Sequence, residues 1–591
     1  MYTAPVVDIT HTLKQATRLG EDLSAGRMGE LSADLLDAIV EEAGKFSSEE
    51  VASLLRVGEE HGTPLKDGVV TMPPGWKEIY NQWVEAGWNA LTGPEEFGGQ
   101  GLTTSLSVAA FEMWNSGSLS FGIGPTLTVG AVEALEKHGS DELKATYLAK
   151  LVSGEWMGTM NLTEPQAGSD LNALRARAER RDDGTYRVFG QKIFITYGEH
   201  DLTDNIIHLV LARLPDAPAG TRGISLFLVP KFLVNEDGSL GARNDLFCSG
   251  VEEKLGIHGS PTCTMIYGDG YAGDEPGAIG YLVGEENRGL ACMFTMMNNA
   301  RLLVGIQGVA AAEAAYQHAL SYAQERKQGR AIGQTSEGMA AIVEHPDVQR
   351  NLATMKALTA ATRAICYDCA HALDLARLDE DKAFWANRAN LLTPIAKAFS
   401  TDVGVEVASI GVQIHGGMGF IEETGAAQFL RDARIAPIYE GTNGIQAIDL
   451  VSRKLPLEGS EVVRAYLAEL SETIDRVAVS NRSPLQEQAE NLRAALTDLT
   501  EATDWILASL EAGETNAVLC GATPYLRLFG LASGGVYLAR LALAAECHRE
   551  EDRTAVLSFF AENILSETSA LLKIVTKGAD SLNALGNILK N

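Results

Sequence analysis

The hydrophobic period of the chain changes twice, and this pattern constrains the fold more than any other feature of the sequence. From Leu31 to about Val152, apolar residues recur at spacings of three and four, as in ELSADLLDAIVEEAGKF, which is typical of amphipathic helices. Between Met160 and Gly284 the apolar runs are short and β-rich, as in YRVFGQKIFITYG, IIHLVLARL and GISLFLVPKF. From Cys292 helical spacing returns and continues to the end of the chain. The sequence therefore predicts a β domain between helical regions.

We expect a mainly helical α+β protein with four domains. These are an N-terminal extension with a helical domain, a middle β domain, a helical bundle and an additional C-terminal helical domain, with the ranges 1–158, 159–285, 286–455 and 456–591. A chain of 591 residues, 46% of them hydrophobic, is long enough to bury several domain-sized cores. The segment KLPLEGS marks the last boundary, where helical spacing stops and starts again.

Charge and hydropathy exclude several classes of function. The formal net charge of -30 disfavours a nucleic-acid partner, because neutralising phosphates requires a basic surface. The longest apolar stretches, such as LVGIQGVAAAEAA, are interrupted well before the roughly 18 residues of a membrane span. The first residues do not combine a basic start with an apolar block, so no secretory signal is visible. We therefore expect a cytoplasmic protein that does not associate with membranes.

Cysteine usage points to a reducing compartment. The seven cysteines are odd in number and scattered, which argues against a disulfide framework. Cys366 and Cys369 have the spacing of a redox motif, but they lie in a helical stretch without a neighbouring strand, so we do not expect redox chemistry there. No metal site is expected either.

Glu440 lies in the segment RDARIAPIYEGTNGIQAID and allows two interpretations. Thr442 and Asn443 are good N-cap residues and Gly441 bends freely, so the segment could simply start a helix. Alternatively, the turn presents the carboxylate of Glu440 to a ligand. The residues of this segment alone do not decide between the two.

Two motifs of the β region could line a ligand. In MNLTEPQAGSDL, Thr163, Gly168 and Ser169 offer hydroxyls and unhindered backbone N–H groups at a bend, although an ordinary turn would look the same. In GQKIFITYG, Phe194 and Thr196 are two residues apart on a predicted strand and should face the same side. An aromatic ring and a hydroxyl could flank a heterocycle, while an aromatic stripe more often belongs to a core.

The following helical region contributes arginines and a glycine-rich turn. Arg301 follows two asparagines and Arg326 lies in AQERKQGR; both suit phosphate or carbonyl oxygens, and both could also lie on a solvated helix face. In QIHGGMGF, the glycines let the backbone approach a ligand or let two helices touch. We expect His415 in this motif to make a hydrogen bond in the core.

The combination of these motifs is more specific than any one of them. TEPQAGSD, GQKIFIT, an arginine that opens the helical block, ERK, GGMGF and RDARIAPIYEGTNGIQ, in this order, resemble the acyl-CoA dehydrogenase family of flavoproteins. The resemblance covers about residues 80 to 455. The additional segments at both ends resemble the long branch of the family, in particular bacterial enzymes that act on 3-methylmercaptopropionyl-CoA in dimethylsulfoniopropionate degradation.

The resemblance implies the cofactor FAD and a role for each motif. Glu440 is then the base that removes the α-proton of a thioester, and the backbone N–H of the base and a flavin hydroxyl stabilise the enolate. The residues expected to bind FAD are Leu162, Thr163, Gly168, Ser169, Phe194, Thr196, Arg326, Gln413, Gly416, Gly417, Thr442 and Gly444. The residues expected to bind the acyl-CoA are Ser169, Asn298, Arg301, Tyr439 and Gly441.

The chain departs from the family pattern at several points. Some members of the family carry the base in the segment that corresponds to MFTMMNNARL, but this segment contains no carboxylate here. Glu440 therefore has no rival for the role of base in that segment. Met160 replaces an aromatic residue, Gly444 replaces a longer side chain, and the segment 328–345 is longer than in short members, so adenosine contacts after Arg326 are not transferred.

The resemblance also implies a reaction and partners, with alternatives. We expect dehydrogenation to a trans-2-enoyl-CoA with an electron-transferring flavoprotein as acceptor, 3-methylmercaptopropionyl-CoA as favoured substrate and short- and medium-chain acyl-CoAs as side substrates. The alternatives are a general fatty acyl-CoA dehydrogenase, an acyl-CoA oxidase and a non-catalytic assembly factor. From Pro456 onward, 11 Lys and Arg stand against 19 Asp and Glu, which disfavours binding to anionic lipid. We therefore expect a homodimer in which the apolar helix faces of this block pack on protein.

Overall fold

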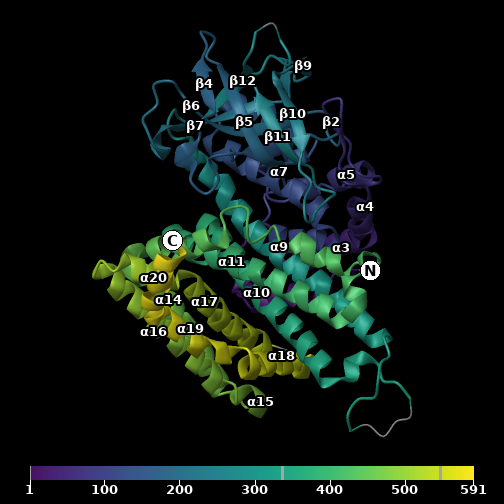
Figure 1. Ribbon diagram of the computed structural model, residues 1–591, viewed down its shortest axis with the longest axis vertical. Coiled ribbons are helices and arrows are strands. Elements are labelled where there is room, and N and C mark those ends of the chain that lie inside the picture. Colours follow the sequence, from purple (N-terminus) through teal and green to yellow (C-terminus); the bar gives the residue numbers. More distant parts are fainter. Residues whose placement is uncertain (1, 274, 334–337, 545–548, 591) are drawn as a thin grey trace. The chain divides into compact units, whose positions relative to one another are not determined.

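The computed structural model describes residues 2–273, 275–333, 338–544 and 549–590. Its elements form two compact units, which we call the helical unit and the sheet unit and describe separately (Figure 1). The helical unit consists of Met1–Gly44, Thr104–Ser116 and Arg301–Asn591. The sheet unit consists of Lys45–Thr103 and Gly117–Ala300. The predicted mainly helical α+β fold with a β domain between helical regions is confirmed.

The two units do not follow the order of the chain. Part of the N-terminal region, including helix α6 (Thr104–Gly117), belongs to the helical unit. A buried carboxylate explains this packing: Asp374 of helix α10 (Pro346–Leu378) accepts hydrogen bonds from the backbone N–H groups of Thr104 at 2.6 Å and Ser105 at 2.9 Å. Asp374 thus satisfies two N–H groups at the start of α6 that have no partner within the helix.

The sheet unit is built on an eight-stranded mixed sheet. Seven of its strands follow the order β10-β11-β5-β12-β7-β6-β3, and β4 pairs with β5 and β6. The strands are β3 (Met157–Asn161), β4 (Arg177–Arg180), β5 (Tyr186–Thr196), β6 (Ile206–Arg213), β7 (Ile224–Pro230), β10 (Leu246–Val251), β11 (Thr262–Tyr267) and β12 (Ala278–Val283). The central strands β6 and β7 are buried almost throughout, which explains their continuous apolar sequences.

Further elements complete the sheet unit. Two short hairpins consist of β1 (Leu65–Lys66) with β2 (Val69–Val70) and β8 (Phe232–Val234) with β9 (Leu240–Arg243). The helices are α4 (Leu54–His61), α5 (Trp76–Glu85), α7 (Leu119–His138) and α8 (Asp141–Ser153). Helices α3 (Ala33–Glu49) and α9 (Gly289–Glu325) each continue from one unit into the other.

The helical unit surrounds three long helices. These are the second part of α9, α10 and α11 (Lys382–His415). Small residues let α9 and α11 approach closely, because a Cβ atom at Gly308 would lie 2.3 Å from the Ser400 carbonyl oxygen and one at Gly404 would lie 2.7 Å from that of Gly308. The remaining helices before residue 455 are α1 (Val6–Gln15), α2 (Leu19–Ser24), α12 (Ala426–Ala433) and α13 (Asn443–Asp449).

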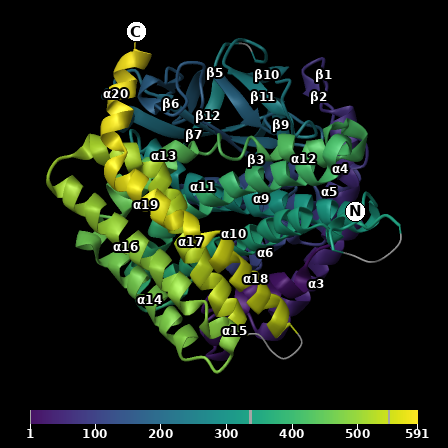
Figure 2. The same cartoon turned by 60° about the horizontal axis from the view of Figure 1, so that its bottom comes forward.

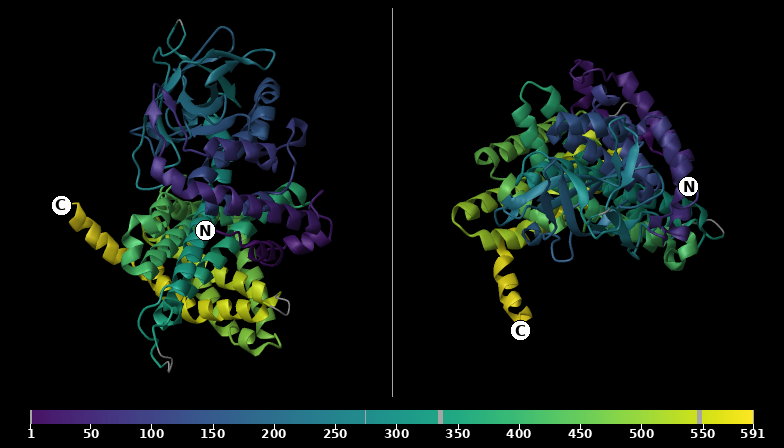
Figure 3. Two further views of the ribbon diagram at one scale, coloured as in Figure 1. Left: turned by 90° about the vertical axis from the view of Figure 1, so that its right-hand side faces the viewer. Right: turned by 90° about the horizontal axis from the view of Figure 1, so that it is seen from above.

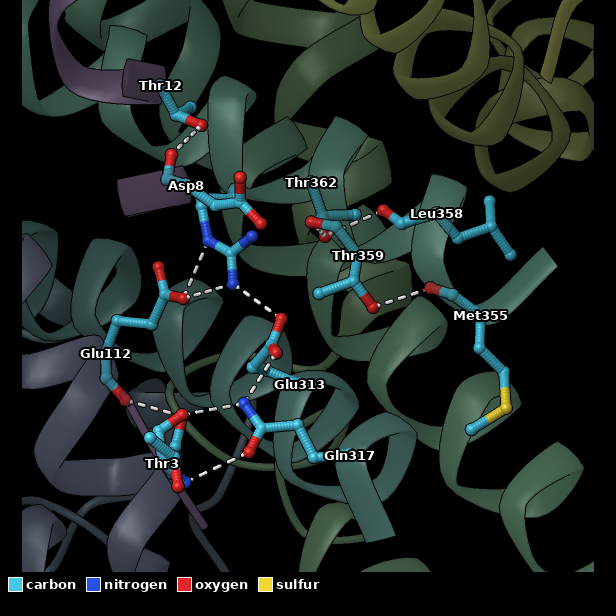
Figure 4. Close-up of polar contacts among 12 residues, drawn as sticks. Thr3, Asp8, Thr12, Glu112, Glu313, Gln317, Met355, Leu358, Thr359 and Thr362 are labelled. Carbon is cyan, nitrogen blue, oxygen red and sulfur yellow. Dashed lines mark hydrogen bonds and ion pairs between the residues drawn. The ribbon is translucent and has the colours of Figure 1, made fainter. Parts of the chain in front are cut away.

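A buried ionic cluster fixes the N-terminal segment to these helices. Arg363 of α10 donates to Glu112 at 2.7 Å and to Glu313 at 2.8 Å, and all three side chains are buried. Figure 4 shows Glu112 and Glu313 beside Gln317 and Thr3. Gln317 closes two hydrogen bonds with the backbone of Thr3, of 3.0 and 2.9 Å. Because each buried charge has a partner, the cluster avoids the large cost of an isolated charge.

The residues after 455 form helices that pack against one another and against α10. They are α14 (Glu461–Ala478), α15 (Ser483–Gln486), α16 (Ala489–Glu511), α17 (Thr515–Leu543), α18 (Glu550–Asn563), α19 (Thr568–Lys577) and α20 (Ala579–Leu589). Helix α17 contacts α10, α16, α18 and α19, and Figure 2 shows it among them. Helix α20 extends away from α16 and α19 (Figure 3). Its side chains Leu582, Leu585, Ile588 and Leu589 are 49–77% exposed.

Two helices of the described chain are long and apolar enough to cross a membrane, contrary to the expectation from the interrupted apolar stretches. In α9, 56% of the apolar window is buried within the protein, and in α17 the share is 83%. The core helices of soluble proteins pass the same test, and the burial of both windows fits that explanation.

Candidate active site

Glu440 lies in a strained turn that also caps a helix. Its φ is +56°, a left-handed conformation that is rare for residues other than glycine, and Gly441 follows at +83°. Thr442 is the N-cap of α13, since its hydroxyl accepts a hydrogen bond from the backbone N–H of Ile445 at 3.2 Å. The first interpretation of this segment is therefore confirmed, since the turn starts a helix, and Glu440 lies just before the cap in an unusual backbone conformation.

The carboxylate of Glu440 is suited to accept a proton. Burial raises its pKa from 4.5 to about 7, although Arg301 and Lys397 act to lower it. The carboxylate makes no hydrogen bond or ion pair within the described residues, and neither does the backbone N–H of Glu440. The backbone carbonyl oxygen of Glu440 accepts hydrogen bonds from Arg301 Nε and Gln446 Nε2, both at 3.4 Å. The turn is thus held through its carbonyl, while the carboxylate and one N–H remain available to a ligand.

Arg301 approaches the base from helix α9. Its side chain is half-buried, and burial lowers its pKa while Asp449 and Glu440 act to raise it. Asn298 lies three residues earlier on α9 and is exposed. One face of a helix can carry both residues, because positions three apart are neighbours on its surface.

Glycine at position 441 is explained by the protein itself. A Cβ atom there would lie 2.6 Å from Gln446 Nε2, and the left-handed φ disfavours any side chain. Tyr439, which is expected to bind the acyl-CoA, donates a hydrogen bond from its hydroxyl to Gln307 Oε1. The polar end of the Tyr439 side chain therefore already has a partner within the protein. Gly444 lies exposed in the first turn of α13.

A second group of predicted residues gathers where α9 and α11 end. The ring of His415 stacks on His318 and Tyr322 of α9 with centroid distances of 4.7 and 4.4 Å. Its Nδ1 donates to the Gly411 carbonyl at 2.7 Å, so the prediction of a core hydrogen bond is confirmed. Arg326 follows Tyr322 by one helical turn and is exposed.

The glycine-rich turn beside His415 is open. Gly416 and Gly417 are exposed, as is Gln413, and a Cβ atom at either glycine would meet no atom within 4 Å. This leaves space for a ligand next to the backbone. Residues 334–337 of the long segment after Arg326 lie outside the described residues.

A buried ion pair organises the predicted flavin segment of the sheet unit. Lys192 of β5 is fully buried and donates to Glu164 at 2.8 Å and to the Leu162 carbonyl at 3.0 Å. Glu164 also accepts from the backbone N–H groups of Arg175 and Ala176. Burial opposes ionisation of Glu164, but Lys192 and these donors outweigh it and lower its pKa. The pair therefore joins the loop after β3 to β5.

The same contacts bring the two sequence motifs together. The backbone N–H of Ile193 donates to the carbonyl of Thr163 at 2.9 Å, so GQKIFIT lies against the start of TEPQAGSD. Leu162 and Thr163 are half-buried, whereas Gly168 and Ser169 are exposed. The two motifs therefore lie side by side in the sheet unit.

Phe194 leaves the regular strand at a β-bulge. Ile195 pairs with Cys263 and Lys192 with Met265, so β5 contains one extra residue opposite Thr264. Phe194 has φ +61° and is 59% exposed. Phe194 and Thr196 are both more exposed than the buried Ile195 between them, as expected if the two residues face the same side. The bulge leaves a large aromatic ring exposed two residues before Thr196, which is half-buried and pairs with Thr262.

Sequence reasoning missed the residues that support the site. Glu164 and Lys192 lie inside the quoted motifs but received no role, and Asn443 was considered only as a cap. Lys397 of α11 is fully buried. The available signal was a single cation inside the apolar run LLTPIAKAFS.

Two other features do not contribute to this site. Cys366 and Cys369 are buried in α10, where burial raises the pKa of both thiols, that of Cys369 to about 12, which fits the expectation that they are not redox groups. A hollow of about 710 Å³, open solvent included, lies between α1, α9, α10, α17 and α18 and is lined by none of the predicted site residues. No group of three or more His, Cys, Asp or Glu that could hold a metal occurs among the residues described.

The chain belongs to the acyl-CoA dehydrogenase family. Family models match its N-terminal domain at residues 34–155, its middle domain at 159–269 and its C-terminal domain at 287–455, and an acetyl-CoA dehydrogenase C-terminal-like domain matches at 466–586. The predicted family is therefore confirmed.

Individual relatives cover nearly the whole chain. A 3-methylmercaptopropionyl-CoA dehydrogenase of Ruegeria pomeroyi is 46% identical over 98% of this chain and 99% of its own. A broad-specificity linear acyl-CoA dehydrogenase of Mycobacterium tuberculosis is 30% identical over 97% of both chains. The crystal structure of Caenorhabditis elegans ACDH-11 in complex with C11-CoA matches with a TM-score of 0.78, 21% identity and coverage of 98% and 96%, which shows a shared fold.

Proposed function

We propose that this protein is an FAD-dependent acyl-CoA dehydrogenase that converts an acyl-CoA to its trans-2-enoyl-CoA. The observation that carries the proposal is Glu440, a carboxylate without a partner among the described residues, with a pKa raised to about 7 by burial and an adjacent free backbone N–H. A base that titrates near the working pH is efficient in proton transfer.

The residues of the chain fit FAD. Phe194 is a large aromatic side chain that the bulge of β5 exposes, as expected for a ring that contacts another planar group. Gly168 and Ser169 provide open backbone in the sheet unit, and Gly416 and Gly417 provide it in the helical unit. Arg326 could bind a phosphate with its planar fork of donors. The other predicted contacts are Leu162, Thr163, Thr196, Gln413, Thr442 and Gly444.

The protein's own part in the reaction is to position the thioester and take its α-proton. Glu440 accepts this proton, which makes its carboxyl neutral. The enolate oxygen is stabilised by the backbone N–H of Glu440, and removal of one such donor in other enzymes costs roughly 3–4 kcal/mol. FAD supplies the acceptor for the β-hydride when bound. Arg301 and Gln446 keep the N–H in place by holding the carbonyl of the same residue.

The favoured substrate is 3-methylmercaptopropionyl-CoA, which would yield methylthioacryloyl-CoA as a step of dimethylsulfoniopropionate degradation. The 46% identity over nearly the full length of both chains to the Ruegeria pomeroyi enzyme supports this choice. Short- and medium-chain acyl-CoAs are expected as side substrates, since the broad-specificity relative also covers the whole chain.

The proposed electron acceptor is an electron-transferring flavoprotein, as the family resemblance implies. We propose a cytoplasmic homodimer without a membrane or nucleic-acid partner. The exposed aliphatic face of α20 supports an association between copies, because burying such a face is worth about 25 cal/mol per Å². The free cysteines of the described residues suit a reducing compartment.

Anaerobic titration of the purified holoenzyme tests the function. Addition of 3-methylmercaptopropionyl-CoA, butyryl-CoA or octanoyl-CoA should bleach the flavin absorbance, with the lowest half-saturating concentration for the first. Glu440→Gln should keep bound FAD and bind the same thioesters while the bleaching rate falls at least about a hundredfold. A colourless protein that does not take up FAD would support a non-catalytic relative instead.

A further inference from the structure

Lys397 is a buried cation beside the base, and its position is unusual for a lysine. It lies on α11 with none of its surface exposed. Its Nζ donates to the side-chain oxygen of Asn443 at 2.7 Å, and no carboxylate of the described residues lies within ion-pair distance. An ammonium group in such surroundings is costly unless nearby charge compensates it.

Asn443 connects Lys397 to the turn of the base. Its backbone N–H donates to the Pro437 carbonyl at 3.0 Å, which closes the segment that contains Glu440. Its side-chain amide donates to Asp402 Oδ1 at 2.7 Å and to the Ala398 carbonyl at 3.0 Å. Lys397 and Asp402, both on α11, therefore bind the oxygen and the nitrogen of the Asn443 side-chain amide.

The charged groups around Glu440 leave Lys397 a distinct role. Arg301 on α9 and Lys397 on α11 interact with Glu440 directly. Asp402 interacts with Lys397, and Asp449 and Arg453 interact with Arg301. Arg301 has Asp449 as a further carboxylate neighbour. Burial lowers the pKa of Lys397 to about 7. The negative charges of Glu440 and, to a smaller extent, Asp402 act to raise it. Burial also raises the pKa of Asp402, which weakens Asp402 as a counter-charge.

We propose that Lys397 is a positioning residue for the dehydrogenation: through Asn443 it holds the turn that presents Glu440, and its buried positive charge favours the ionised form of that base. This inference rests on the proposed function and adds a residue to it. The family resemblance and the sequence motifs assign no role to Lys397. The arrangement makes Glu440 and Lys397 a coupled pair, in which protonation of the base leaves the lysine charge uncompensated.

Two substitutions separate the effect of the Lys397 charge from that of its hydrogen bond to Asn443. Lys397→Met removes both, whereas Lys397→Gln removes the charge but retains an N–H that can donate to Asn443. The matched control is Lys382→Met, the same loss of charge at the exposed first residue of the same helix. Removing a buried cation without an ion-pair partner is compatible with folding, and the glutamine variant offers a second chance if the methionine variant does not fold.

The measurement is the pH dependence of kcat/KM with a dye acceptor, together with the FAD content of each variant. Both Lys397 variants should retain FAD and shift the acid limb of the profile upward by about one pH unit, because an opposite charge nearby lowers the pKa of a carboxyl. Lys397→Met alone should also lower the plateau, and Lys382→Met should match the wild type. An unshifted acid limb in folded, FAD-loaded Lys397→Met and Lys397→Gln would overturn the inference. A wild type without dehydrogenase activity would instead refute the proposed function.

Discussion

Acidification should inactivate the enzyme in a range where an ordinary glutamate would still be ionised. Burial raises the pKa of Glu440 to about 7. At pH 5 only about one Glu440 in a hundred is then ionised, so kcat/KM should lie about a hundredfold below its plateau. With the ordinary value of 4.5, the loss at pH 5 would be only about a quarter.

The assay is steady-state kcat/KM between pH 5 and 9 at constant ionic strength, with an artificial dye as acceptor so that no partner protein titrates. The pH dependence of kcat/KM reports groups of the free enzyme, which is the state described here. Glu440→Gln provides the control, since its residual rate should not show the same limb. A loss of only about a quarter at pH 5, or an identical limb in Glu440→Gln, would refute the assignment of the base.

The same pKa predicts an effect on stability, with a definite sign. Glu440 binds its proton more tightly when folded than when unfolded, so its contribution is fully present below pH 4.5 and is lost as the pH rises to about 7. Relative to the wild type, Glu440→Gln should therefore gain stability between pH 5 and 8, by up to about 3 kcal/mol. A difference in melting temperature between the two proteins that does not change with pH would contradict this expectation.

Three further predictions concern other parts of the molecule. Reduced enzyme with bound product should reoxidise slowly in air and quickly with a dye, because a closed site excludes oxygen; stoichiometric peroxide release at the dye-coupled rate would indicate an oxidase. Lys192→Met should leave Glu164 as an unpaired buried charge and weaken FAD retention on gel filtration, whereas the exposed Lys327→Met should not. A chain that ends at Leu455 should aggregate, because α17 buries most of its residues after Cys520 and packs on α10 and α11, whose apolar surface the truncation would expose; a soluble, fully assembled truncated enzyme would defeat this expectation.

The order of secondary structure could be predicted because the β region and the helical regions differ in the length and composition of their apolar runs. The buried strands β6 and β7 are short, β-rich apolar runs bounded by turn residues, whereas α9 to α11 are long stretches of helix-forming residues, and these elements appear where expected. The contact of α6 with Asp374 could not be predicted in the same way. This contact depends on a carboxylate about 270 residues away in sequence, and a local sequence pattern does not predict a contact between residues so far apart.

The residues of the candidate site could be named only through the order of the motifs. Glu440 has the chemistry of a helix cap as much as that of a base, and its left-handed φ does not follow from a segment in which Gly441 and Thr442 already explain the turn. The bulge at Phe194 shows the opposite limit. A strict alternation of residues along β5 predicts neither the extra residue between Lys192 and Ile195 nor the left-handed φ of Phe194.

The supporting residues suggest how the strain at Glu440 is maintained. A residue other than glycine in a left-handed conformation costs roughly 1–3 kcal/mol and persists only where the surroundings fix it. Here Arg301 and Gln446 bind the carbonyl of Glu440 from one side. Asn443, held by Lys397 and Asp402, anchors the following turn from the other. Because none of these contacts uses the carboxylate, the protein fixes the backbone of the base and leaves its side chain to the substrate.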